Sequence, residues 1–177
     1  MRAIFLTTVL VCLCSCTLST SEDKNPKQRA ATDEELLRLG DELYNSFPKN
    51  GDNCVYPRYF GGSYIDEGCL VVLIKNMSKK GMEDINEMIG DSSFLKFKNC
   101  QYSLQELQDV KKKLDDVYFN NTSLRNSLKW HSVGINIIKN RVTVYLENLS
   151  AKNIERFKKK LMDSPVVVYE GAVDTTM

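Results

Sequence analysis

Apolar side chains recur at helical spacing in two stretches of the chain, and a capping box stands before each stretch. Thr32 is followed three residues later by Glu35, and Ser103 by Glu106, so a hydroxyl and a carboxylate are placed to satisfy the first helical N–H groups. Pro48 would end the first helix, and a pair of asparagines the second. The apolar positions of the two predicted amphipathic helices are Leu36, Leu39, Leu43, Phe47 and Leu107, Val110, Leu114, Tyr118.

Two short alternating segments follow each helix and predict a β-hairpin. The expected strands are residues 63–65 with 70–74 in the first half, and residues 135–137 with 142–146 in the second. Gly68 and Asn140 occupy the same place in the two loops. Both residue types take positive φ readily, as the third residue of a short bulged loop requires.

A second helix and a third strand complete each half. Ser78 and Ser150 are candidate N-caps, and the last strands are expected at residues 94–97 and 165–169. The sequence therefore predicts an α+β fold. It would be a tandem duplication of an α-β-β-α-β unit, each with a small three-stranded sheet, antiparallel or mixed, packed on helices.

A shift of the chain by 72 residues supports the duplication. Residues 62–97 then fall on residues 134–169 without a gap, and nine of the 36 pairs are identical. The expected organisation is a signal peptide at 1–15, a flexible tether at 16–31, a first unit at 32–102, a second unit at 103–171 and a tail at 172–177.

The amino terminus has the pattern of an export signal. Arg2 precedes an apolar run at residues 3–13 that is too short to span a bilayer, and small residues follow it. The Leu-Cys-Ser-Cys sequence at residues 13–16 resembles a bacterial lipobox, in which Cys16 would be lipidated. We therefore expect a lipoprotein anchored to the inner or outer membrane of a bacterial cell envelope, with plain secretion as the alternative.

Charge and cysteine content exclude some classes of partner. Without residues 1–15 the chain has 23 basic and 23 acidic side chains, so nucleic acid is not an expected partner. Cys54, Cys69 and Cys100 then remain, and an odd number precludes complete pairing, although one bridge between Cys54 and Cys100 is conceivable. Neither the cysteines nor the histidine content has the spacing of a metal site, and no cofactor is predicted.

The sequence offers little for catalysis. His131 is the only histidine, and no local signature joins it to Ser132 or to a cysteine as a nucleophile. The repeated Asp-Ser pairs at residues 91–92 and 163–164 follow a helix and precede a strand, which is typical of a turn. We therefore expect a protein that is not an enzyme and has no catalytic residues.

One sheet face differs between the two halves. In the first hairpin the residues that alternate with the core positions are apolar, whereas in the second they are polar. Either the chain itself covers this second apolar face, through its amino-terminal helix or the other unit, or the face binds a partner. The candidate partner surface comprises Cys69, Val71 and Leu73, rimmed by Tyr56, Tyr59 and Tyr64.

Several short segments carry a family resemblance. They are Val-Gly-Ile-Asn-Ile at residues 133–137, Asn-Arg-Val-Thr-Val at 140–144, Asn-Ile at 153–154 and Val-Val-Val-Tyr at 166–169. They resemble the carboxyl-terminal subdomain of the prosegments of bacterial trypsin-like serine proteases of the α-lytic type. The segment at residues 56–65 is similar to tandem modules in small envelope proteins of Bacteroidota and Firmicutes.

The resemblance implies a function through protein binding. Such prosegments help their protease to fold and then inhibit it, with a tail that would correspond here to residues 171–177. Because no protease follows Met177 in this sequence, we expect any such role to act in trans. The expected function is a non-catalytic, lipid-anchored envelope protein that binds an envelope or secreted protein such as a protease. The alternative is a structural or assembly lipoprotein of the envelope.

The lipobox interpretation predicts where the protein fractionates. Replacing the sulfur in Cys16→Ser removes the acylation site, so the variant should leave the membrane fraction and lose radioactive palmitate label. Labelling and membrane fractionation of the wild type and the variant check this. Label that persists in Cys16→Ser would contradict the assignment.

Overall fold

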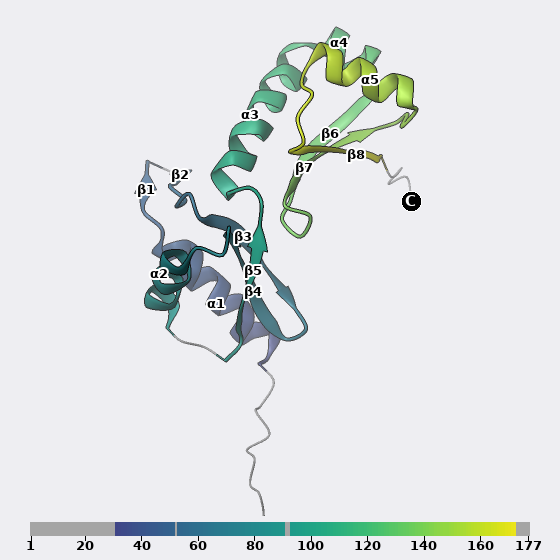
Figure 1. Ribbon diagram of the computed structural model, residues 1–177. Coiled ribbons are helices and arrows are strands. Elements are labelled where there is room, and N and C mark those ends of the chain that lie inside the picture. The colour runs from purple at the N-terminus through teal and green to yellow at the C-terminus, as the bar shows by residue number, and fades with distance from the viewer. Residues whose placement is uncertain (1–30, 52, 91–92, 173–177) are drawn as a thin grey trace, which may run out of the picture.

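The computed structural model describes residues 31–51, 53–90 and 93–172 (Figure 1). The predicted signal peptide, Cys16, nearly all of the tether and most of the tail lie outside these residues. None of the helices among the described residues combines the length and the apolar character that a membrane span needs.

The described residues form two units that follow the same order. The first contains α1 (Asp33–Ser46), a small hairpin of β1 (Lys49–Asn50) and β2 (Asn53–Cys54), then β3 (Phe60–Asp66), β4 (Cys69–Lys75), α2 (Lys79–Ile89) and β5 (Leu95–Cys100). The second contains α3 (Leu104–Asn120), α4 (Thr122–Ser127), β6 (Trp130–Asn136), β7 (Arg141–Leu146), α5 (Ala151–Lys160) and β8 (Val167–Gly171). The predicted α+β duplication is confirmed, with the β1–β2 hairpin and α4 as differences between the copies.

Each unit has a three-stranded mixed sheet, in the orders β3-β4-β5 and β6-β7-β8. The first two strands are an antiparallel hairpin, and the third runs parallel to the middle strand because a helix carries the chain back across the sheet. Leu70 pairs with Leu95, and Val142 pairs with Val167. In the middle and third strands, equivalent residues of the two copies are therefore 72 positions apart.

Local capping explains where the first helix of each unit begins. Thr32 accepts from the N–H of Glu35, whose carboxylate accepts from the N–H of Thr32, and Ser103 with Glu106 repeats the arrangement. Both predicted capping boxes are therefore confirmed. Helix α3 ends at Asn120, but the next residue, Asn121, accepts from the N–H of Leu124 and begins α4, which the sequence did not suggest.

The registers of the two hairpins differ. Tyr64 pairs with Val71, whereas Gly134 pairs with Thr143. Val71 and Thr143 are 72 residues apart, but Tyr64 and Gly134 are 70 apart. The gap-free alignment is thus wrong at the first strand, because the second hairpin has two more residues in its loop. The shift is even, so each strand keeps the same face toward its core.

The two loops have different lengths, but each ends in a residue of positive φ. Gly68 has φ +68° and Asn140 has φ +52°, as predicted. Glu67 and Gly68 both have positive φ and form a two-residue turn of the kind that suits the twist of paired strands. The second loop has four residues, 137–140, and the N–H of Asn140 donates to the carbonyl of Ile137 at 3.0 Å. The predicted three-residue bulged loop is therefore wrong in both copies.

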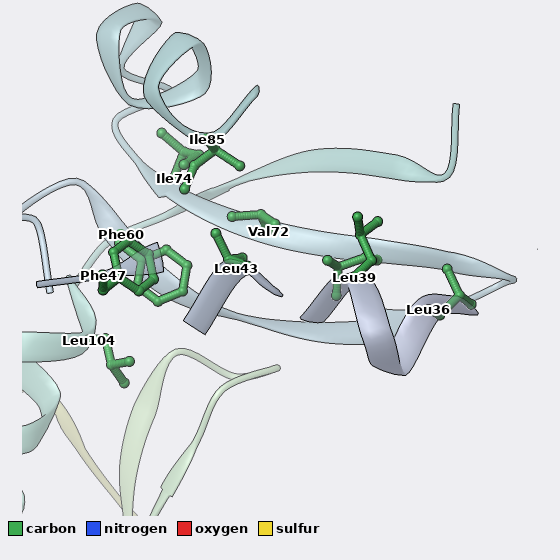
Figure 2. Packing of buried hydrophobic residues seen from close by; sticks show 10 residues of the cluster. Leu36, Leu39, Leu43, Phe47, Phe60, Val72, Ile74, Ile85 and Leu104 are labelled. Carbon is green, nitrogen blue, oxygen red and sulfur yellow. The ribbon is translucent and has the colours of Figure 1, made fainter. Parts of the chain in front are cut away.

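Each unit has its own core, formed where its helices cover one face of its sheet. In the first core, Leu36, Leu39 and Leu43 of α1 follow the hairpin of β3 and β4. Figure 2 shows Leu43 beside Val72 and Leu36 nearer the tip of the hairpin. At one end the rings of Phe47 and Phe60 pack with centroids 4.7 Å apart. The second core is built around residues that share these roles: Leu107, Leu114, Leu128, Trp130, Val142, Val144, Leu146 and Phe157.

Candidate functional site

The outer face of the first sheet, where a partner surface was predicted, is covered by the chain itself. Val71 is 5% exposed and Leu73 is 2% exposed, although neither lies on the helix-covered face of β4. Tyr64 on β3 lies opposite Val71, and Lys98 on β5 lies opposite Leu73. The Lys98 ammonium donates to the Tyr64 hydroxyl at 3.2 Å, so the two long side chains meet from opposite edges of the sheet. Neighbouring strands thus contribute to this cover. Of the two covers that were expected, α1 packs on the opposite face of the sheet, while Ile137 of the second unit contacts Gly62 of β3.

The other predicted surface tyrosines lie elsewhere. Tyr56 packs against the rings of Phe47 and Phe60, at 5.4 and 5.7 Å, in the first core. Burial, reinforced by a hydrogen bond with Cys54, raises the pKa of Tyr56 to about 12. The ring of Tyr59 lies on Gly81 of α2, where a Cβ would come within 2.8 Å of it.

The six predicted residues therefore do not form one surface. Tyr64, Cys69, Val71 and Leu73 share the outer face of the sheet, and Cys69 is only partly buried. The two remaining tyrosines pack against the first core with the helices. Alternation along β4 could locate the first group, but nothing local in the sequence shows that the segment before β3 turns toward the helices.

The residues considered for catalysis are not assembled into a reactive group. His131 is exposed, and its Nδ1 lies 3.3 Å from the hydroxyl of its neighbour Ser132. Burial raises the pKa of the Cys100 thiol to about 11, which disfavours the nucleophilic thiolate. Cys54, Cys69 and Cys100 are free thiols, so the Cys54–Cys100 bridge is absent from the structure. Among the described residues, no three His, Cys, Asp or Glu side chains are grouped as metal ligands.

The second Asp-Ser pair has the predicted turn role. The carbonyl of Ser164 accepts from the N–H of Val167, and its hydroxyl accepts from the N–H of Val166 at 3.4 Å. Asp163 lies 3.7 Å from the ammonium of Lys158 at the end of α5. The first pair, at residues 91–92, lies outside the described residues.

Asn140 joins the two units. Its side-chain oxygen accepts from the backbone N–H groups of Gln101 and Tyr102, at 3.0 and 2.8 Å, and its amide donates to the carbonyl of Tyr102 at 2.8 Å. Arg141 adds a hydrogen bond to the Gln101 side chain and places its guanidinium 4.9 Å from the centroid of the Tyr102 ring. The tip of the second hairpin is therefore fixed to the segment between the two units.

Apolar contacts cross the same boundary. Ile137, in the four-residue loop, lies so close to Gly62 of β3 that a Cβ there would come within 2.8 Å of its Cδ1. Ile135 packs against both cores. Helix α3 also contributes to both, because Leu104 is buried in the first core and Leu107 in the second.

An ion pair holds the start of α3 to the first unit. The ammonium of Lys75, at the end of β4, lies 2.7 Å from the carboxylate of Glu106. Burial opposes the charged form of Glu106, but hydrogen bonds from Lys75 and Ser103 outweigh it and lower its pKa. Glu106 therefore caps its own helix and anchors that helix to β4.

The free edges of the sheets differ in their protection against further strands. β5 carries the exposed lysines Lys96 and Lys98, which discourage the pairing of another chain. β8 carries no lysine. The carbonyl of Val166 and the N–H of Ala172 bond to β7. Along a strand, residues that bond to one neighbour alternate with residues whose backbone groups point to the other side. The odd-numbered residues Tyr169 and Gly171 therefore direct their N–H and carbonyl groups to the free edge.

Family comparisons divide the chain at the segment that Asn140 fixes. Residues 19–100 match the Pro-like N-terminal domain, and residues 105–172 match the Pro-like C-terminal domain. The chain is therefore a tandem of two Pro-like, prosegment-like domains. The two Pro-like domains are the two structural units, which confirms the predicted resemblance to protease prosegments, with the first unit matching the N-terminal domain. No curated protein matches the chain.

We predict that Asn140 stabilises the protein through the hydrogen bonds of its side chain as well as through its backbone conformation. Asn140→Gly suits the positive φ but leaves the partly buried N–H groups of Gln101 and Tyr102 without their acceptor, so it should lower the free energy of unfolding by about 1 to 3 kcal/mol. Urea titration followed by Trp130 fluorescence measures the change. The reciprocal control, Gly68→Asn, has open space for the new side chain and keeps a residue type that tolerates positive φ. It should lower stability by no more than about 1 kcal/mol through left-handed strain. Equal effects of the two substitutions on stability would show that the side-chain hydrogen bonds of Asn140 contribute nothing.

Proposed function

We propose that this protein binds a secreted trypsin-like serine protease in trans, as a folding helper or an inhibitor, and that it performs no catalysis itself. The observation that carries the proposal is the pair of prosegment-like domains that extends over residues 19–172. Prosegments act by binding a protease. Two such domains held together by α3 and Asn140 offer a partner one preassembled surface, so less conformational entropy is lost on binding.

The β8 edge is the part of this surface best suited to a protease strand. Its outward amides at Tyr169 and Gly171 can pair with an extended segment, as in other cases where a peptide adds to a sheet edge. Tyr169 packs its ring on Phe157 at 5.4 Å, which holds the strand against the second core. The edge is therefore fixed in place before any partner arrives.

The amino terminus supports a location where such a partner is found. An export signal followed by Cys16 would hold the protein in the bacterial cell envelope through lipid. Secreted proteases cross this compartment while they fold.

A refolding experiment tests the proposal. Mature protein, residues 16–177 with Cys16→Ser, is added to a denatured α-lytic-type protease that lacks its own prosegment, and recovered activity is measured. We expect recovery to rise with added protein, or the folded protease to be inhibited. Gly171→Pro removes one outward N–H from β8 and should weaken the effect about tenfold, as expected for one lost hydrogen bond.

The matched control keeps the amide. Gly171→Ala places its Cβ at an ordinary 3.5 Å from Leu149, so it should behave as the wild type. If the protein neither aids folding nor inhibits the protease, the proposal fails and the structural or assembly role in the envelope takes its place. If Gly171→Pro acts as strongly as Gly171→Ala, binding does not use the β8 edge.

A further inference from the structure

A shallow groove of about 280 Å³ lies between α1 and β3 in the first unit. Leu37, Gly40 and Tyr44 line it from the helix, and Ser63 and Ile65 line it from the strand. Leu37 is 60% exposed and Ile65 is 41% exposed. Large apolar side chains that face each other across an open groove are typical of a surface that becomes buried on binding.

The floor of the groove is bordered by the free edge of a sheet. β3 is the outer strand of its sheet, and among the described residues no strand pairs with its other side. The N–H of Ser63 points to that side, because it donates to the Tyr44 hydroxyl at 3.3 Å. By the two-residue period of a strand, the N–H and carbonyl of Ile65 point the same way. An extended chain in the groove would therefore meet the outward N–H and carbonyl of Ile65 as well as apolar side chains, whereas the N–H of Ser63 is already bonded to the Tyr44 hydroxyl.

The helix on the other side of the groove is strongly acidic. Helix α1 carries five carboxylates against one guanidinium, a formal charge of −4. The single guanidinium, Arg38, is already paired with Glu42 at 2.6 Å. Asp41 lines the groove itself and is exposed. The charge of α1 favours an occupant with basic side chains.

We propose that this groove binds an extended segment of a partner protein, added as a strand to the free edge of β3, that presents both apolar and basic side chains on the face turned toward α1. The apolar side chains pack on Leu37 and Ile65, and the basic ones balance Asp41 and the rest of α1. A second copy of this chain fits less well, because pairing through β3 would bring two α1 helices of like charge together. This site goes beyond the protease-binding role of β8, which belongs to the other unit.

Peptide binding tests the site on the mature protein. The probe is a fluorescein-labelled eight-residue peptide in which every second residue is threonine and the residues between alternate valine and lysine, so that valine and lysine share one face. Its anisotropy is compared with that of the same peptide with glutamate in place of lysine. We expect the basic peptide to bind at least tenfold more tightly, and to lose its affinity when a central valine is replaced by proline. Leu37→Glu should weaken binding at least tenfold, and Asp41→Lys, which changes the formal charge of α1 from −4 to −2, should reduce the preference for the basic peptide.

Controls separate the groove from general attraction and from misfolding. Phe119→Glu adds the same charge at a 71% exposed apolar position on α3 and should leave binding unchanged. Ile65→Thr keeps a strand-forming residue and gives a second test from the opposite wall if Leu37→Glu does not fold. Equal affinity for the two peptides, no binding at millimolar concentration, or insensitivity to both groove substitutions would overturn the proposal. The proposal would also be overturned if sedimentation showed a dimer for the wild type and a monomer for Leu37→Glu, because the occupant of the groove would then be a second copy.

Discussion

The contact between the Asn140 side chain and the segment before α3 determines how the two units of this protein act together. Each unit has its own core of buried side chains. Three hydrogen bonds from one side chain nevertheless fix the second hairpin to Gln101 and Tyr102, where one Pro-like domain gives way to the next. Helix α3, which begins just after them, supplies an apolar side chain to both cores.

The copies touch where they have diverged. The second hairpin loop has two residues more than the first, and this longer loop contains both Ile137, which packs on Gly62, and Asn140. A two-residue loop like that of the first hairpin would reach less far from its sheet. The duplication therefore gave two similar modules, and a small change in loop length coincides with the contacts between them. Those contacts also set how the β8 edge and the α1 groove lie relative to each other.

The sequence predicted the elements whose cause is local. Capping boxes at Thr32 and Ser103, apolar periodicity in the helices and positive φ at Gly68 all depend on residues close in the chain. What it could not predict depends on distant partners. Identities such as Gly62 with Gly134 concealed the shift of register, and alternation gave the outer face of β4 without showing that Tyr64 and Lys98 would cover it. The free edge of β8 could not be predicted because the order of the strands in the sheet was not known from the sequence.

Native-state hydrogen exchange on the mature protein tests most directly whether the two units form one cooperative body. The amides of Val72 and Val144 lie in the central strands of the two sheets. The account predicts that both open with the same free energy, within about 1 kcal/mol, and that this equals the global free energy of unfolding. Exchange at Val72 through an opening several kcal/mol below that at Val144, or the reverse, would show that the units unfold independently and would contradict the account.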